Sequence, residues 1–288
     1  MRRLRYEIVD VFTDRPYAGN PLAVVLDADG VDGTQMRWIA REFNLSETAF
    51  VLPPSPGADY RIRIFTPGTE LPFAGHPSVG TAATLARLGR IKPGERVQEC
   101  GAGMVSVSVT DGAATLTGGT ATVGAELDPE PLLRAVGLTR QDLAGPVPRV
   151  AGCGISFYYL AVRPDAPARA VPDVAALRAL GQAGLSVFVW DPDSQVAHSR
   201  VFCDAVGVPE DPATGSAALG FGVWLVAAGL AAPDGTTTYT VRQGVEMHRP
   251  STLECAVVAS GGRTTRTTVA GGVVPVASGD IVVPPFVG

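Results

Sequence analysis

The sequence predicts an α+β protein of two similar halves, each a sheet wrapped around one central helix. Three observations support this fold class. The chain of 288 residues carries an internal repeat, its expected strands outnumber its expected helices, and each half contains one unusually apolar helix. A helix with few charged residues is expected to be buried, so we place each apolar helix inside the sheet of its own half.

The repeat emerges when the chain is compared with itself at an offset of 140 residues, which places Gly75 on Gly215 and Leu45-Ser46 on Leu185-Ser186. Short matches also arise by chance in a chain rich in Gly, Ala and Leu, but the shared order of elements favours a duplication. Half of 288 is 144, so two copies fill the chain. We expect the first repeat domain over residues 1–122, with 279–288 as a candidate addition, and the second over 123–278.

The first half is expected to alternate strands and helices. Alternating or β-branched residues predict strands over 6–12, 22–26, 45–52, 60–65 and 104–110. Thr34 can cap a helix that ends near Asn44, and Pro77 suits the first turn of the next helix, where its missing N–H leaves no bond unmade.

The second half repeats this scheme. The predicted strands are 158–162, 185–190, 199–203, 253–258 and 281–283, with one around Val241, and a short helix is expected over 174–180. The long apolar helix falls within 212–233, which contains no charged residue. Residues 120–131 show the weakest strand or helix periodicity in the chain and are the candidate linker between the halves.

Composition excludes several classes of protein. Apolar residues make up 46% of the chain and charged residues 18%, which argues against disorder, and a net charge of −5 without a basic stripe argues against nucleic acid as a partner. Three histidines without an H-E-x-x-H motif argue against a catalytic zinc site. Four widely spaced cysteines indicate reduced thiols in a cytoplasmic protein.

No targeting or membrane segment is expected either. The basic N-terminus is not followed by the apolar region of a signal peptide. Residues 212–233 are long enough to span a membrane but are flanked by Asp211 and Asp234 rather than by basic anchors, so a buried helix fits better.

Glu47 is the strongest candidate for chemistry. In a strand it shares a face with Leu45, Ala49 and Val51, and a carboxylate in such an apolar row is costly to bury unpaired. It could form a salt bridge with Arg61 or Arg63, or it could be a desolvated proton shuttle with a raised pKa. The pattern leaves these two interpretations evenly balanced.

Three further candidates lie at the two predicted helix starts. His76 follows Gly75, and Asp211 and Ser216 flank the matching turn of the second half. Taken singly, each has a structural explanation: a buried histidine, a helix cap and a polar first-turn residue. Both helix starts expose backbone N–H groups, so we expect a small anion to bind between Gly75-His76 and Gly215-Ser216.

Several motifs together resemble the phenazine-biosynthesis PhzF family over essentially the whole chain. The motifs that carry the resemblance are Ala18 to Val25, Asn44 to Thr48, Phe65 to Thr81, Glu210 to Ala218 and Gln243 to Ser251. The resemblance implies a diaminopimelate-epimerase-like fold of two pseudo-symmetric domains, each a β-barrel around a central helix. It also implies a homodimer and no metal or organic cofactor.

The resemblance implies roles for individual residues. Glu47 matches the family's catalytic acid and base, and His76, Asp211 and Ser216 match its supporting residues. We expect the substrate-binding residues to be Gly75, Ser78, Gly215 and Ala217.

Four positions limit how far the family's properties can be transferred. Asp204 and His248 replace a usual Pro and Gly, so the pocket could differ from that of the best-known member. Related epimerases carry thiols where this chain has Ala74 and Thr214, which disfavours racemisation by two bases.

The leading hypothesis is a cofactor-independent isomerase in which Glu47 moves a proton on a small carboxylate-bearing metabolite, with a dihydro-hydroxyanthranilate as one candidate. A hydrolase or lyase using the same glutamate is the alternative within enzymes. A binding protein that has kept the anion site and lost the reaction is the alternative outside them.

Overall fold

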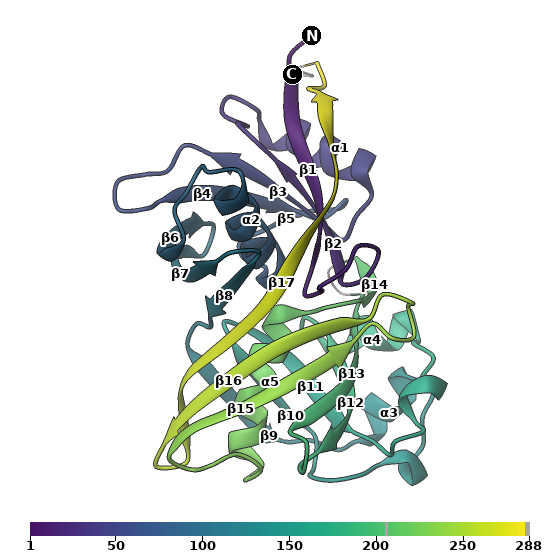
Figure 1. Cartoon of the computed structure of the whole chain (residues 1–288). Coiled ribbons are helices and arrows are strands. Elements are labelled where there is room, and N and C mark those ends of the chain that lie inside the picture. The colour runs from purple at the N-terminus through teal and green to yellow at the C-terminus, as the bar shows by residue number, and fades with distance from the viewer. Residues whose placement is uncertain (205–206, 286–288) are drawn as a thin grey trace. The chain divides into compact units, whose positions relative to one another are not determined.

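The computed structural model describes residues 1–204 and 207–285, and these divide into two compact units (Figure 1). The first unit comprises Met1–Leu116 and Ala270–Gly288, and the second comprises Thr117–Val269. The first unit is therefore discontinuous, because the end of the chain returns to complete it. The boundaries expected from the sequence, at 122–123 and 278–279, were those of the two repeat copies and not of compact units. They stay predictions.

In the first unit a sheet wraps around one helix. Its strands are β1 (Arg3–Val11), β2 (Asn20–Val25), β3 (Glu47–Leu52), β4 (Tyr60–Phe65), β5 (Glu70–Leu71), β6 (Gly94–Cys100), β7 (Gly103–Thr110), β8 (Ala113–Thr117) and the later part of β17 (Arg263–Val282). β1 pairs antiparallel with both β2 and β17. β2 and β3 are parallel, β3 and β4 antiparallel, and β4 and β6 parallel.

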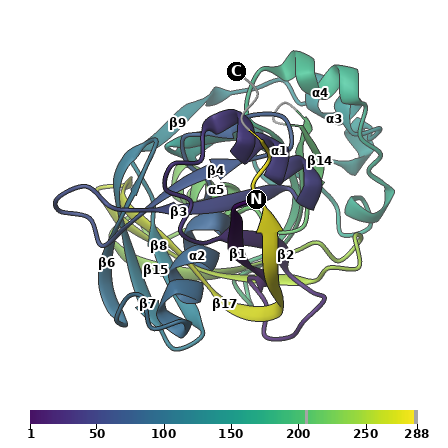
Figure 2. The same ribbon diagram turned by 90° about the horizontal axis from the view of Figure 1, so that it is seen from above.

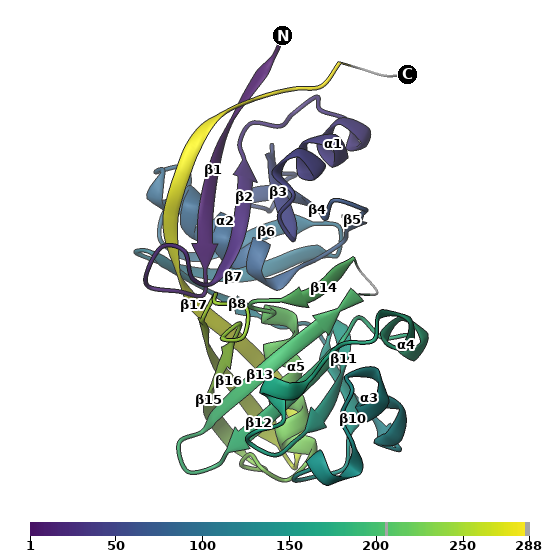
Figure 3. The ribbon, with the colours of Figure 1, turned by 90° about the vertical axis from the view of Figure 1, so that its right-hand side faces the viewer.

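Two helices cover opposite sides of β3 in the first unit (Figure 2 and Figure 3). α2 (Gly75–Arg87) packs against β1, β2, β3 and β7, and its residues from Gly75 to Leu85 are buried. α1 (Gly33–Phe43) packs against β3 and β4. The predicted cap of α1 was wrong by two residues: Asp32 caps it, accepting from the backbone N–H groups of Thr34 and Gln35. Asp is the better cap because a carboxylate accepts both bonds.

The second unit has the same kind of core. Its strands are β9 (Ala121–Glu126), β10 (Arg149–Cys153), β11 (Ile155–Ala161), β12 (Leu185–Asp191), β13 (Val196–Cys203), β14 (Val208–Asp211), β15 (Gly235–Gln243), β16 (Ser251–Ser260) and the first part of β17. Residues 120–131 were expected to be a linker, and this was wrong: β9 pairs antiparallel with β10. β9 is largely exposed, so it has no alternating apolar pattern to reveal it.

Helix α5 (Gly215–Ala227) is the buried helix of the second unit and packs against β9, β10, β11 and β16. Two tyrosine hydroxyls, of Tyr159 and Tyr239, donate to the carbonyls of Ala217 and Ala218 on this helix. Within the described residues, no helix combines the length and apolar character that a membrane crossing needs.

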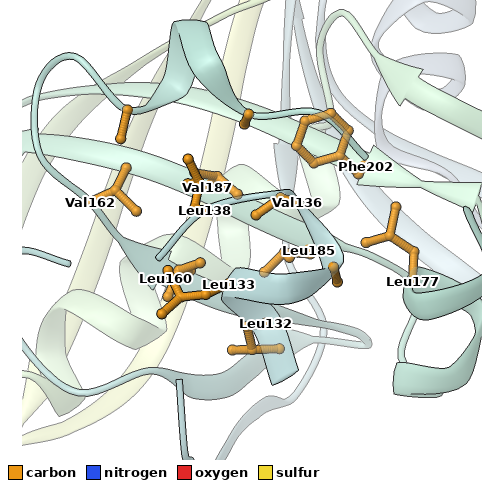
Figure 4. Close-up of a cluster of buried hydrophobic side chains, with 13 residues drawn as sticks. Leu132, Leu133, Val136, Leu138, Leu160, Val162, Leu177, Leu185, Val187 and Phe202 are labelled. Carbon is orange, nitrogen blue, oxygen red and sulfur yellow. The ribbon is translucent and has the colours of Figure 1, made fainter. Parts of the chain in front are cut away.

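A separate apolar cluster lies between the strands of the second unit and its outer helices, α3 (Glu130–Ala135) and α4 (Val174–Leu180). Figure 4 shows Leu132, Leu133 and Leu177 on these helices, near Leu185 and Phe202 of the strands. Two 3₁₀ turns, η1 (Arg140–Asp142) and η2 (Pro167–Arg169), complete the unit.

The two units share one order of pairings. The parallel pair β2–β3 and the antiparallel pair β3–β4 correspond to β11–β12 and β12–β13. The parallel pair β4–β6 corresponds to β13–β15. Both central helices have 13 residues and begin at Gly75 and Gly215. This agreement is what the repeat leads one to expect, while an origin by duplication stays a prediction.

Candidate functional site

Glu47 is the first residue of β3 and is only 9% exposed to solvent. It lies opposite Leu22 of the parallel strand β2. The two arginines that the sequence offered as partners are bound elsewhere. Arg61 Nε lies 3.6 Å from a Glu99 carboxylate, and Arg63 binds Glu70 through two hydrogen bonds of 2.7 Å. The salt bridge considered for Glu47 with these two arginines is therefore not formed.

His76 lies beside Glu47 in the first turn of α2. Its Nδ1 is 3.5 Å from Glu47 Oε2 and 3.2 Å from Asn20 Nδ2. The Ser46 hydroxyl donates to Asn20 Oδ1 at 3.1 Å. The parallel pairing of β2 with β3 and the burial of α2 against both strands bring these four side chains together. Sequence reasoning missed Asn20 and Ser46 as members of the site, although both stand in motifs that carry the family resemblance.

The His76 ring is neutral at neutral pH. Burial lowers its pKa to about 3, and the nearby backbone of Pro21 acts more weakly in the opposite direction. The short distance to Glu47 is therefore not an ion pair, because an imidazolium would have to be desolvated with the ring 3% exposed. His76 can act as a neutral hydrogen-bonding group beside the carboxyl group.

The start of α2 presents backbone N–H groups. Within the described residues no acceptor is found for the N–H groups of Gly75 and His76, and Ala74 makes no side-chain cap. Ser78, in contrast, is engaged by the protein: its hydroxyl donates to Ala74 O and accepts from Gln98 Nε2, both at 2.9 Å. The sequence led us to expect that Ser78 binds the substrate. To donate to a substrate, its hydroxyl would have to give up the bond to Ala74 O, whereas its second lone pair can still accept a bond.

In the second unit Asp211 ends β14 and is 7% exposed. The Thr214 hydroxyl donates to Asp211 Oδ2 at 2.6 Å, and Gln243 Nε2 donates to the Asp211 carbonyl at 2.6 Å. Asp211 is not the N-cap of α5; Thr214 occupies that position without a side-chain capping bond. The contact of Gln243 with Asp211 could not be predicted from a local pattern, because Gln243 is 32 residues away in sequence. The contact of Thr214, only three residues away, is local and was missed.

Ser216 follows in the first turn of α5 and is 6% exposed. Among the described residues, no hydrogen-bond partner is found for the Ser216 hydroxyl, and no acceptor is found for the backbone N–H groups of Gly215, Ser216 and Ala217. These groups can therefore bind an oxygen of a ligand, as the N–H groups at the start of α2 can.

The two departures from the family pattern have local explanations. Asp204 is buried and accepts a hydrogen bond from Arg178 of α4 at 2.5 Å, so it ties that helix to the end of β13. His248 has a positive φ of 57°, a conformation that Gly adopts without strain. Within the described residues, no cluster of His, Cys, Asp and Glu has the arrangement of a metal site, and the four cysteines are buried thiols.

Comparison with known proteins gives consistent matches. The family model described as "Phenazine biosynthesis-like protein" matches residues 9–279. An uncharacterized isomerase of Mesorhizobium japonicum is 39% identical, covering 98% of this chain and 99% of its own. The trans-2,3-dihydro-3-hydroxyanthranilate isomerase of Pseudomonas chlororaphis is 34% identical, covering 96% of this chain and 99% of its own.

Solved structures confirm the fold. A PhzF-family protein from Bacillus anthracis matches with a TM-score of 0.88 at 26% identity, covering 98% of this chain and 100% of the other. A hydroxyproline epimerase from Agrobacterium vitis matches with a TM-score of 0.67 at 16% identity, covering 98% of this chain and 91% of the other, and shares the fold alone. The predicted α+β fold of the diaminopimelate-epimerase type is therefore correct.

Proposed function

Because the chain belongs to the phenazine biosynthesis-like protein family and is an isomerase, we propose that it moves a proton within a small carboxylate-bearing metabolite without a cofactor. The observation that carries this proposal is the nearly buried Glu47 carboxyl group, 3.5 Å from the neutral ring of His76. A carboxylate in such surroundings can take up a proton and return it, which is the chemistry of a general base that becomes the general acid.

In the first step the Glu47 carboxylate removes a proton from a carbon of the substrate. The C–H bond breaks, an O–H bond forms on Glu47, and the electron pair enters the conjugated system of the substrate. In the second step the Glu47 carboxyl group delivers the proton to another carbon of that system, and the product is an isomer. Limited access of water favours retention of the proton between the two steps.

The start of α2 supplies the electrostatic part of the site. The N–H groups of Gly75 and His76 can hold a carboxylate oxygen of the substrate or the negative charge that develops as the proton leaves. The resemblance assigns Asp211 and Ser216 to the same reaction. This assignment is tested by measuring turnover after substitution of Asp211 or of Ser216.

One base is proposed rather than two. Ala74 and Thr214 stand where related epimerases have thiols, and the Thr214 hydroxyl donates its hydrogen bond to Asp211. Neither side chain can serve as a thiolate base.

The first substrate to test is trans-2,3-dihydro-3-hydroxyanthranilate, on which the Pseudomonas chlororaphis relative acts by name. If the chain does not turn it over, a library of small carboxylates screened by thermal shift supplies further candidates, since a bound ligand stabilises the folded state. Isomerisation of a ligand found in this way supports the proposal. Stable binding of ligands without any turnover, or hydrolysis in place of isomerisation, contradicts it.

The isotopic test follows once a substrate is known. Deuterium placed at the donor carbon should be found partly at the acceptor carbon when the reaction is run in ordinary water, because one carboxyl group carries it. Inversion at a single stereocentre, with solvent hydrogen delivered to the opposite face, would show that two bases act.

A further inference from the structure

We propose that Asn20 is a positioning residue that holds His76 in its neutral Nε2–H tautomer, so that the ring cannot donate a hydrogen bond from Nδ1 to Glu47. The consequence for catalysis rests on the proposed function. The tautomer itself can be observed without any substrate, so the two can fail independently.

The orientation of the Asn20 amide is set by Ser46. The Ser46 hydroxyl donates to Asn20 Oδ1 at 3.1 Å, which turns the amide nitrogen Nδ2 toward His76 Nδ1 at 3.2 Å. Asn20 is fully buried, so water does not compete for either end of the amide. An amide nitrogen can only donate, and His76 Nδ1 must then be the acceptor.

The proton of the neutral ring therefore lies on Nε2, because neutral imidazole carries only one N–H. Nε2 is buried, and no hydrogen-bond partner is found for it among the described residues. A buried donor that the fold leaves unsatisfied is costly and calls for an explanation. A substrate oxygen, of a carboxylate or a hydroxyl group, is the partner that fits this donor.

The distances around the ring agree with this assignment. An N–H that donates to a carboxylate usually lies 2.7–3.2 Å from it, whereas His76 Nδ1 and Glu47 Oε2 are 3.5 Å apart. The backbone of Pro21 is the competing partner of the ring. If the Pro21 carbonyl oxygen accepted a hydrogen bond from Nδ1–H, the ring would be in the opposite tautomer. The two alternatives are therefore the Nε2–H and Nδ1–H forms of the neutral ring, which can be told apart by experiment.

The tautomer matters because of what it would do to Glu47. A hydrogen bond donated by His76 would stabilise the carboxylate and weaken it as a base. With Nδ1 occupied by Asn20, this bond cannot form. His76 is then a neutral donor that points its proton at the substrate instead of at Glu47.

The test uses the full chain, labelled with ¹⁵N, and long-range ¹H–¹⁵N correlation spectra of the histidine rings. The chain contains three histidines, so His198 and His248 serve as internal references and His76→Gln assigns the third ring. We expect His76 to show a protonated Nε2 and an unprotonated Nδ1 near neutral pH. A proton on Nδ1 in the wild-type protein overturns the proposal.

Two variants test the cause. Asn20→Ala removes the donor to Nδ1, and we expect the pure Nε2–H state to become a mixture of tautomers. Ser46→Ala removes only the bond that orients the amide, so it should give a smaller shift and keeps the test decisive if Asn20→Ala does not fold. The matched control is Ser186→Ala, at the repeat-related position, whose hydroxyl bonds Ser199 in the second unit. The control should leave His76 unchanged, and an unchanged tautomer in both test variants contradicts the proposal.

Discussion

At the scale of single residues, Glu47 combines burial with a neighbour that cannot neutralise its charge. The nearest nitrogen of His76 is 3.5 Å away on a ring that burial keeps neutral. Such a carboxyl group is suited to gaining and losing a proton, since neither charge state is locked by an ion pair with this ring. The two predictions at this scale concern these two residues.

Glu47→Gln should lower kcat by at least about 100-fold, because Gln keeps the volume and most hydrogen bonds but cannot exchange a proton. The free energy of unfolding should be little changed or slightly higher, since a desolvated charge is removed. The measurement is turnover of the identified substrate together with urea denaturation. Glu99→Gln, on β6, is the matched control and should retain activity. Near-wild-type turnover by Glu47→Gln would remove Glu47 from the mechanism.

His76 should make the protein less stable in acid. Its pKa is about 3 in the folded state and about 6.5 when unfolded. Between these values the unfolded state binds more protons, so the free energy of unfolding falls as pH falls. The loss from this residue is at most about 2 kcal/mol between about pH 6.5 and pH 5. Urea denaturation at both pH values measures it, and His76→Gln should show a correspondingly smaller acid loss. Equal losses in both proteins would mean that His76 titrates normally.

At the scale of elements, an arginine–glutamate ion pair, here called a clamp, precedes each of the two central helices, α2 and α5. Arg63 binds Glu70 of β5, and Arg200 binds Glu210 of β14, each through two hydrogen bonds. The surroundings differ: Arg200 also donates to the carbonyls of Pro167 and Ala170, and its side chain is 10% exposed against 27% for Arg63. The second clamp thus fixes β14 and Asp211 from a nearly buried position.

Arg200→Ala should lower the free energy of unfolding by about 3–5 kcal/mol, because it leaves a partly buried carboxylate and two carbonyls without their donor. Arg63→Ala, the matched control, should lower it by about 1 kcal/mol or less, since its pair is more exposed. Chemical denaturation of the two variants measures the difference. Equal and small losses would show that burial does not distinguish the two clamps.

At the scale of the whole molecule, the first unit is built from both ends of the chain. β1 pairs with β17 from Arg3 opposite Val282 to Val11 opposite Val273. The first unit therefore cannot be complete until the last strand has been made, and its closure depends on contacts that are distant in sequence.

Removal of residues 270–288 should expose β1 while leaving β15 and β16 protected, because only the first unit loses a strand. Hydrogen–deuterium exchange of the truncated and full-length chains measures this, with fast exchange expected in β1 and slow exchange in the β15–β16 pair. Protection of β1 equal to that in the full-length chain would show that its pairing with β2 is sufficient.

Much of the fold could be predicted from the sequence because its signals are local. The central helices were predicted from their uncharged, Gly-containing starts, and most strands from their alternation. β9 was missed because an exposed strand leaves no apolar pattern. The cap of α1 was predicted at Thr34 instead of Asp32 because several polar residues near a helix start can accept the same hydrogen bonds.

In the candidate site, the local sequence pattern was enough to identify Glu47 as a carboxyl group in an apolar strand and to locate the two helix starts that expose N–H groups. The groups that surround this carboxyl group became known only from the folded chain. Asn20 and His76 are 56 residues apart and meet because β2 and β3 run parallel beside α2. The register of strands and the packing of a helix depend on contacts across the whole unit, which no local pattern encodes.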